Sequence, residues 1–313
     1  MAGKIAGVLP ILHTPFDEND AIDFDSLASE IDWAFEVGAD GVCTAMVSEI
    51  LRLSDVERIQ LNRQVVELAA GRGVVVASVG AESTRQAVEF ANDAASAGCN
   101  AVMAIPPVTT PLDEEQLRSY FGAIAKCVDV PLIVQDASSY VGKSIPTSFY
   151  VQLLDEYGPE KILFKPEGAP VGPNISELRD VSDRRARMFD GSGGIYLVDA
   201  YRRGVIGTMP GVDLLDAVVA LWGALCRGDE ETAYRISLPL GAIVALQLQA
   251  ELDGFLAIEK FLMVKRGIFA TACRRQPYSW SLDPETEAEV ERLFGRLLDV
   301  LHSIGSSATG ESL

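Results

Sequence analysis

Lys165 is the residue whose type and position most directly indicate chemistry in this chain. It ends the apolar run at residues 162–164, and strand alternation would place its side chain on the same side as Leu163. Burial on that side would disfavour the ammonium form and supply the neutral amine that attacks a ketone to form an imine. A structural ion pair with Glu167, two residues further on, is the competing interpretation.

Other polar residues follow the apolar runs of the first two-thirds of the chain. They are His13, Thr14, Ser48, Glu49, Gln135, Asp136, Glu167, Ser192, Gly193 and Thr208. Carboxylates among them could exchange protons, while hydroxyls and the backbone amides of the glycine-rich turn at residues 190–194 could hold a ligand. A tight turn without ligand is an equal alternative for residues 190–194, and a lone histidine such as His13 is more often part of a hydrogen-bonded core.

The elements that must position these side chains alternate short β-branched runs with longer segments of helical period. This pattern is typical of βα units around a parallel sheet. Capping residues begin the helices at Asp23, Ser54 (with Glu57), Ser83 and Asp113. Strands are expected at residues 7–14, 41–46, 74–79, 101–105, 132–135, 162–165, 186–189 and 205–208.

Eight such units predict an α/β fold with a single (β/α)₈ barrel over residues 5–225. In such barrels the catalytic groups lie at the carboxyl ends of the strands, where the polar residues occur here. Residues 226–302 keep the helical period without strands and are interrupted by Pro277 and Pro284, which predicts a C-terminal helical extension. Residues 303–313 are expected to form a disordered polar tail.

Composition narrows the class of partner. The formal net charge is −19, which disfavours nucleic acid or an anionic membrane surface as the main partner and favours a small molecule. No uninterrupted apolar run approaches the roughly 18 residues that span a bilayer, and the first residues lack a signal-peptide pattern, so a cytoplasmic protein is expected. Five cysteines without a CxxC pair and only two histidines argue against a disulfide framework and a multi-histidine metal centre.

Several motifs at consistent spacing resemble the superfamily of dihydrodipicolinate synthase and N-acetylneuraminate lyase. They are Thr14-Pro15-Phe16-Asp17, Leu53-Ser54 with Glu57-Arg58, Glu82-Ser83-Thr84-Arg85, Ile105-Pro106-Pro107 and Phe164-Lys165-Pro166-Glu167. The resemblance runs from about residue 5 to 225. It implies a class I aldolase-like barrel in which Lys165 forms the Schiff base, without a metal or other cofactor, in a homo-oligomer that is a tetramer or a dimer.

The chain departs from that family at three places around the lysine. The Gly-Thr-Thr-Gly-Glu loop that holds a keto-acid carboxylate is Ala45-Met46-Val47-Ser48-Glu49 here. The relay tyrosine is replaced by Gln135, which does not exchange a proton at neutral pH, and the arginine that receives the second substrate aligns with Tyr140. The tyrosine pair after the two prolines becomes Val108-Thr109. These changes argue against genuine dihydrodipicolinate synthase activity.

The leading hypothesis is therefore a divergent Schiff-base lyase, an aldolase or dehydratase, acting on a 2-keto acid or a related carbonyl or sugar-acid compound. Lys165 would be the nucleophile and Asp136 and Glu49 the acid–base groups. Thr14, Ser48, Gln135, Glu167, Ser192, Gly193 and Thr208 would contact substrate. Two alternatives stay open: a non-catalytic relative that binds a small carbonyl ligand, and a barrel enzyme that uses Glu49, Asp136 and a divalent metal.

Overall fold

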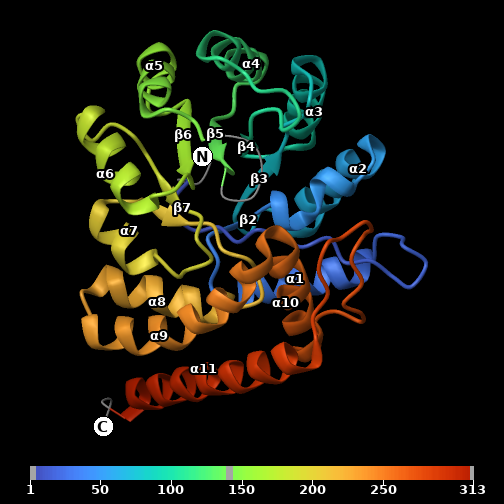
Figure 1. The fold of residues 1–313 in the computed structure, drawn as a ribbon, viewed down its shortest axis with the longest axis vertical. Helices are drawn as coiled ribbons and strands as arrows, with labels where there is room; N and C mark the ends of the chain where they lie inside the picture. Colours follow the sequence, from blue (N-terminus) through green and yellow to red (C-terminus); the bar gives the residue numbers. More distant parts are fainter. Residues whose placement is uncertain (1–4, 139–143, 311–313) are drawn as a thin grey trace.

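The computed structural model describes residues 5–138 and 144–310 and shows a closed barrel of parallel strands surrounded by helices (Figure 1). The strands are β1 (Gly7–Val8), β2 (Gly41–Cys43), β3 (Val74–Ser78), β4 (Ala101–Ala104), β5 (Leu132–Asp136), β6 (Ile162–Pro166), β7 (Phe189–Asp190) and β8 (Gly207–Thr208). They pair in the orders β1-β8-β7 and β2-β3-β4-β5-β6. Parallel bridges from Ile11 to Cys43 and from Phe164 to Met188 join the two groups and close the ring.

The barrel helices begin where the capping residues predict. They are α1 (Phe24–Glu36), α2 (Asp55–Ala69), α3 (Thr84–Ala97), α4 (Glu114–Cys127), α5 (Thr147–Tyr157), α6 (Val171–Val181), α7 (Leu197–Arg203) and α8 (Leu215–Arg227). The side chains of Asp23, Ser54, Ser83 and Asp113 each accept a hydrogen bond from a first-turn amide of α1 to α4. All eight expected strands are present, with clearly shorter bounds at β1, β2, β7 and β8.

Two apolar layers hold this arrangement. One fills the barrel interior with side chains such as Leu9, Val76, Met103, Ile133 and Leu163. The other lies between the strands and the surrounding helices. Because successive strand residues point to opposite sides, β6 sends Leu163 into the inner layer and Phe164 into the outer one. Lys165 therefore points inward, above Leu163, as strand alternation predicts.

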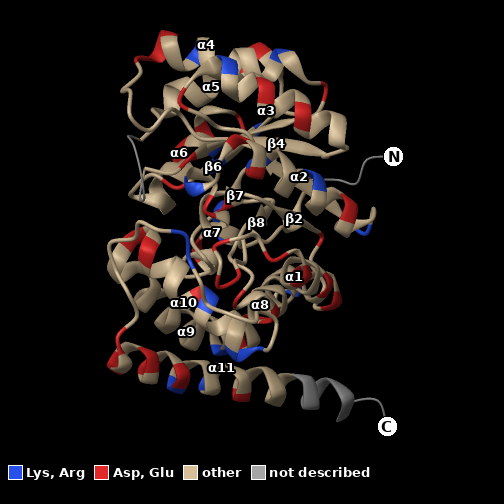
Figure 2. Ribbon diagram, turned by 90° about the vertical axis from the view of Figure 1, so that its right-hand side faces the viewer, with Lys and Arg blue, Asp and Glu red and all other residues tan. Residues whose placement is uncertain are grey.

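The segment after the barrel is helical. It contains α9 (Glu230–Gln247), the short helix η3 (Leu248–Ala250), α10 (Glu251–Lys265) and α11 (Pro284–Gly310). Figure 2 shows α11 as a long helix along one side of the molecule, where it packs on α9. Pro284 is its first residue, where a missing amide donor costs nothing. The helix continues to Gly310, so most of the segment expected to be a tail has helical backbone.

The α9–α10 region also has the length and composition of a membrane span. Residues Glu230–Lys265 form the one candidate within the described chain, and half of its most apolar window is buried in the fold. The region is divided at η3 into two helices, and α9 packs against α8, α10 and α11. Core packing accounts for its hydropathy. This packing places α10 over the carboxyl ends of the barrel strands.

Candidate active site

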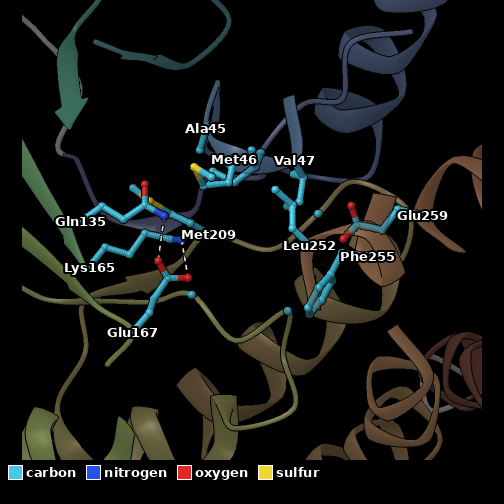
Figure 3. Close-up of a pocket in the computed structure, with 14 residues that line it drawn as sticks. Ala45, Met46, Val47, Gln135, Lys165, Glu167, Met209, Leu252, Phe255 and Glu259 are labelled. Atoms are coloured by element: carbon cyan, nitrogen blue, oxygen red, sulfur yellow. Dashed lines mark hydrogen bonds and ion pairs between the residues drawn. The ribbon is translucent and has the colours of Figure 1, made fainter. Parts of the chain in front are cut away.

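A cavity of about 30 Å³ lies at the carboxyl ends of the barrel strands (Figure 3). Lys165 and Glu167 line one side, together with Gln135 from β5. Loops after β2, β7 and β8 contribute further walls, and α10 closes the opposite side. The remaining lining residues are Ile11, Ala45, Met46, Val47, Gly191, Gly193, Met209, Gly211, Leu252, Phe255 and Glu259.

Lys165, Glu167 and Gln135 form a buried hydrogen-bonded group on one wall. Lys165 and Gln135 are paired residues of adjacent strands, so their side chains leave the sheet on the same face. Nζ of Lys165 donates to Oε1 of Glu167 at 2.8 Å, and Nε2 of Gln135 donates to Oε2 at 2.7 Å. The Lys165 and Glu167 side chains are only 4% and 5% exposed. The ion pair considered as the structural alternative is thus present, and it lies within the cavity.

Burial changes the proton affinity of the Glu167 carboxylate in this pair. Burial raises the pKa of Glu167, against the lowering effects of the Lys165 ammonium and the Gln135 amide. A carboxylate whose protonated form is favoured by burial can carry a proton to and from the adjacent nitrogen. The arrangement therefore supplies both a nucleophilic nitrogen and a proton carrier within hydrogen-bond distance of it.

Gly191 is required by the close approach of the β7–α7 turn to this pair. A Cβ atom at this position would lie 2.4 Å from Oε1 of Glu167 and 2.7 Å from Nζ of Lys165. Such distances are far below van der Waals contact, so only glycine fits without displacement of the pair. The glycine-rich turn at residues 190–194 thus forms a wall of the cavity through its backbone.

Glu259 brings a second carboxylate to the cavity from α10. Its Oε2 atom is 2.8 Å from Nε2 of His13, whose Nδ1 atom is 2.7 Å from Oε1 of Glu30. All three residues are buried. Burial alone would lower the pKa of His13, but the two carboxylates raise it to about 10. His13 is therefore an imidazolium at neutral pH, and it anchors Glu259 at the cavity edge.

Glu49 lies in a different buried pair. Its carboxylate accepts a hydrogen bond from Lys260 and another from the backbone amide of Arg275, at 3.0 Å. Lys260 also donates to the carbonyl oxygens of Thr14 and Cys273, each at 2.8 Å. Glu49 is not among the residues that line the cavity. This network joins the loop after β2 to the segment that follows α10.

Thr14 and Ser48 also make structural contacts. The Thr14 hydroxyl donates to the carbonyl oxygen of Ser48 at 2.6 Å, and the Ser48 hydroxyl donates to that of Leu12 while accepting from the amide of Ala45 at 3.0 Å. These bonds shape the loop whose side chains Met46 and Val47 face the cavity. The structure thus presents apolar side chains where the resembled family has hydroxyls.

Asp136 stabilises the loop that follows β5. Its two carboxylate oxygens accept from the backbone amides of Ser138 and Ile145, at 2.9 and 2.8 Å. It does not line the cavity. Tyr140, which aligns with the family's arginine, lies outside the described residues.

The remaining sequence candidates divide between the cavity and its surroundings. Gly193 lines the cavity, whereas Ser192 lines a neighbouring pocket and accepts a hydrogen bond from the amide of Tyr196 at 3.0 Å. Thr208 donates to the buried carboxylate of Asp190 at 3.0 Å and lies below the cavity wall. Gln135 and Glu167 are the predicted contacts that the structure brings directly to Lys165.

The α10 residues of the cavity were missed by the sequence analysis. Leu252, Phe255 and Glu259 lie outside the segment predicted to be the catalytic barrel. One signal could have indicated them: Glu259 and Lys260 interrupt an otherwise apolar helical stretch. A charged side chain on a buried helix face needs a partner of opposite charge or a hydrogen-bond partner. Buried charged pairs of this kind belong to functional sites or to structural ion-pair networks.

The metal-dependent alternative requires several ligand side chains gathered at one place. Within residues 5–138 and 144–310, no group of three or more histidine, cysteine, aspartate or glutamate side chains is arranged to hold one. Glu49 and Asp136 have separate partners, as described above. The side chains present therefore do not form the carboxylate site that the metal-dependent alternative would need.

Comparison with known proteins places this geometry in a family. Residues 4–159 match the dihydrodipicolinate synthetase family. The chain is 28% identical over 299 residues to L-2-keto-3-deoxyarabonate dehydratase from Azospirillum brasilense, an alignment covering 93% of this chain and 94% of that protein.

Two solved structures share the fold. Dihydrodipicolinate synthase from Rhodopseudomonas palustris is 25% identical with a TM-score of 0.83, covering 95% of this chain and 99% of its own. A catalytic lysine mutant of the Ruminococcus gnavus sialic acid aldolase is 18% identical with a TM-score of 0.85, covering 97% and 99%. The expected barrel fold and lyase class are confirmed. This chain belongs to the dihydrodipicolinate synthetase family.

Proposed function

We propose that this protein is a Schiff-base-forming lyase, an aldolase or dehydratase, that acts on a 2-keto acid or a related carbonyl compound through Lys165. The observation that carries the proposal is the buried amine of Lys165 at the cavity wall, bonded to Glu167 at 2.8 Å. The names of two relatives, a keto-deoxy sugar-acid dehydratase and a sialic acid aldolase with a catalytic lysine, support the same chemistry.

The first step is formation of the imine. Glu167 takes a proton from the Lys165 ammonium, and the freed nitrogen lone pair forms a bond to the carbonyl carbon of the substrate. The carbonyl oxygen then leaves as water after receiving two protons, one from the attacking nitrogen and one that Glu167 returns. Gln135 holds the other oxygen of Glu167 and keeps the carboxylate directed at Nζ. No metal or organic cofactor takes part in this proposal.

The iminium then accepts the electron pair of the bond that breaks. In an aldol cleavage a base removes the proton of a hydroxyl group, the carbon–carbon bond breaks and an aldehyde leaves. In a dehydration a base removes a carbon-bound proton next to the iminium, and hydroxide leaves with a proton from an acid. Glu259, which lines the same cavity, is the second carboxylate for these transfers. Asp136 positions the β5–α5 loop, and Glu49 positions the loop after β2.

Borohydride reduction in the presence of pyruvate tests the proposal. Reduction of an imine on Lys165 adds a pyruvate-derived group that mass spectrometry can locate. We expect this adduct in the wild-type protein and its loss in Lys165→Ala. Lys126→Ala, which removes a lysine that is 70% exposed on α4, is the matched control and should react normally. Absence of an adduct with a panel of 2-keto acids would refute the mechanism and favour a non-catalytic binding protein.

The setting of the enzyme is part of the same proposal. We infer a cytoplasmic homo-oligomer, a tetramer or a dimer, that processes a small molecule and does not bind nucleic acid or membrane. The net charge of −19 supports the exclusion of polyanionic partners. Sedimentation analysis of the purified chain tests the oligomeric state.

A further inference from the structure

A second pocket of about 380 Å³ opens directly beside the lysine cavity. The two share Glu167, Gly191 and Phe255 as common walls. The second pocket, called the outer pocket here, lies between the loop after β6, the loop after β7 and the end of α9. The outer pocket is therefore the neighbouring space toward which a substrate held at Lys165 would extend.

The lining of the outer pocket is mostly apolar. Its apolar members include Pro170, Val171, Pro173, Ile195, Leu248 and Phe255. Tyr196 also lines it, and Tyr196 and Leu248 are among the large hydrophobic residues of the described chain with high exposure, at 48% and 40%. Exposed apolar side chains gathered at the rim of a concave site indicate a ligand surface.

Two polar side chains of the outer pocket, Ser192 and Asp199, have partners within the protein. Oγ of Ser192 accepts from the amide of Tyr196 at 3.0 Å, and the carboxylate of Asp199 is paired with Arg203 at 2.7 Å. A polyhydroxylated chain would lose its water here and find few partners for its hydroxyl groups, which disfavours its binding. The lining thus discriminates against sugar-like substituents.

The charge of the combined site disfavours an anionic extension as well. Among the described residues of the two linings, Lys165 is the basic one, whereas Glu167, Asp199 and Glu259 are acidic. A second carboxylate or a phosphate on the distant part of the substrate would find no basic side chain among the described residues that line the outer pocket. An uncharged substituent is compatible with it.

We propose that the substrate of this enzyme carries an apolar aromatic or branched alkyl group, which occupies the outer pocket while the carbonyl carbon reacts at Lys165. The inference rests on the proposed function and refines its substrate class. This substrate class differs from that in the name of the similar sugar-acid dehydratase. A sugar acid carries polar hydroxyl groups, whereas the substituent proposed for this chain is apolar.

Titration calorimetry with phenylpyruvate and its one-carbon-longer homologue tests the proposal, with pyruvate and a polyhydroxylated 2-keto-3-deoxy acid as comparison ligands. Burial of a ring of this size corresponds to about 10- to 100-fold tighter binding. We therefore expect the better aromatic ligand to bind at least about tenfold more tightly than pyruvate and the polyhydroxylated acid. Equal affinities, or preference for the polyhydroxylated acid, would overturn the proposal.

A charge placed in the outer pocket gives the matched test. Val171 is the first residue of α6, where an aspartate is compatible with the helix dipole. Val171→Asp should weaken binding of the aromatic ligand about tenfold and leave the affinity for pyruvate within about twofold. Val56→Asp makes the same change in the first turn of α2, at a side chain 73% exposed and away from both pockets, and should leave both affinities unchanged.

The outcomes separate this proposal from the proposed function. Failure to trap pyruvate at Lys165 would refute the imine, while calorimetry still reports on the outer pocket. Normal trapping without preference for aromatic ligands would refute the substrate class alone. If Val171→Asp instead changes the sedimentation coefficient and leaves aromatic binding intact, the outer pocket is a contact between copies of this chain and the proposal fails.

Discussion

Gly191→Ala probes the cavity through a steric change alone. The backbone of Gly191 does not have a positive φ, so alanine can adopt its conformation. The new methyl carbon would lie 2.4 Å from Oε1 of Glu167 and 2.7 Å from Nζ of Lys165. Since carbon–oxygen contacts begin near about 3.3 Å, the Glu167 carboxylate must move by roughly 0.9 Å. Displacement of a reacting group by about 1 Å costs about 100-fold in rate.

The assay is the rate of borohydride trapping with pyruvate, measured beside thermal unfolding. We expect a loss of about 100-fold in trapping rate and a stability loss of about 1–3 kcal/mol from overpacking. Gly295→Ala is the control, because its added methyl group has no neighbour within 4 Å and sits in the middle of α11. It should trap normally and be as stable as the wild type or more stable. A Gly191→Ala protein that traps within twofold of wild type would refute the close-approach argument.

Two further predictions concern the buried ionic networks. The folded pKa of His13, about 10, lies above its ordinary value of 6.5, so its stabilising contribution is full below pH 6.5 and is lost as pH rises through 10. Part of the fall in melting temperature between pH 6.5 and 10 should therefore come from His13, and His13→Asn should remove that part. If the melting temperatures of the wild type and His13→Asn fall in parallel over this range, the raised pKa of His13 is contradicted. Lys260→Met should lower the free energy of unfolding by about 1–3 kcal/mol, because the buried Glu49 carboxylate loses its nearest cation and keeps Arg52, at 3.5 Å. In urea denaturation, adding Glu49→Gln should recover part of that loss, and purely additive losses would argue against the pair.

Much of the barrel could be predicted because its signals are local. Short, mainly apolar runs occur at all eight strands, and Asp23, Ser54, Ser83 and Asp113 identify helix starts through bonds to residues two or three positions away. The short bounds of β1, β2, β7 and β8 could not be predicted, because pairing with a neighbouring strand decides where a strand ends. The helical backbone beyond residue 303 was likewise missed, since the polar composition of residues 303–313 was taken as the sign of a tail.

The candidate site could be predicted only in part. Lys165, Glu167 and Gln135 were identified because strand-end position and alternation determine the face on which they lie. Asp136 and Glu49 were chosen by the same rule, but neither lines the cavity, and their carboxylates bond to Ile145 and Lys260 instead. Strand-end position limits which residues approach the site, whereas local hydrogen bonds decide where each side chain points.

Lys165 itself shows the division between sequence and tertiary structure. The sequence by itself determined the barrel, the inward direction of this lysine and the loss of the family's carboxylate loop and relay tyrosine, because these depend on residue type and on alternation over a few residues. Only the tertiary structure decided that Glu167 pairs with it, that Gly191 must lack a side chain, and that Glu259 enters the cavity. The bond between His13 and Glu259 joins residues 246 positions apart, and no local pattern encodes a contact of that span.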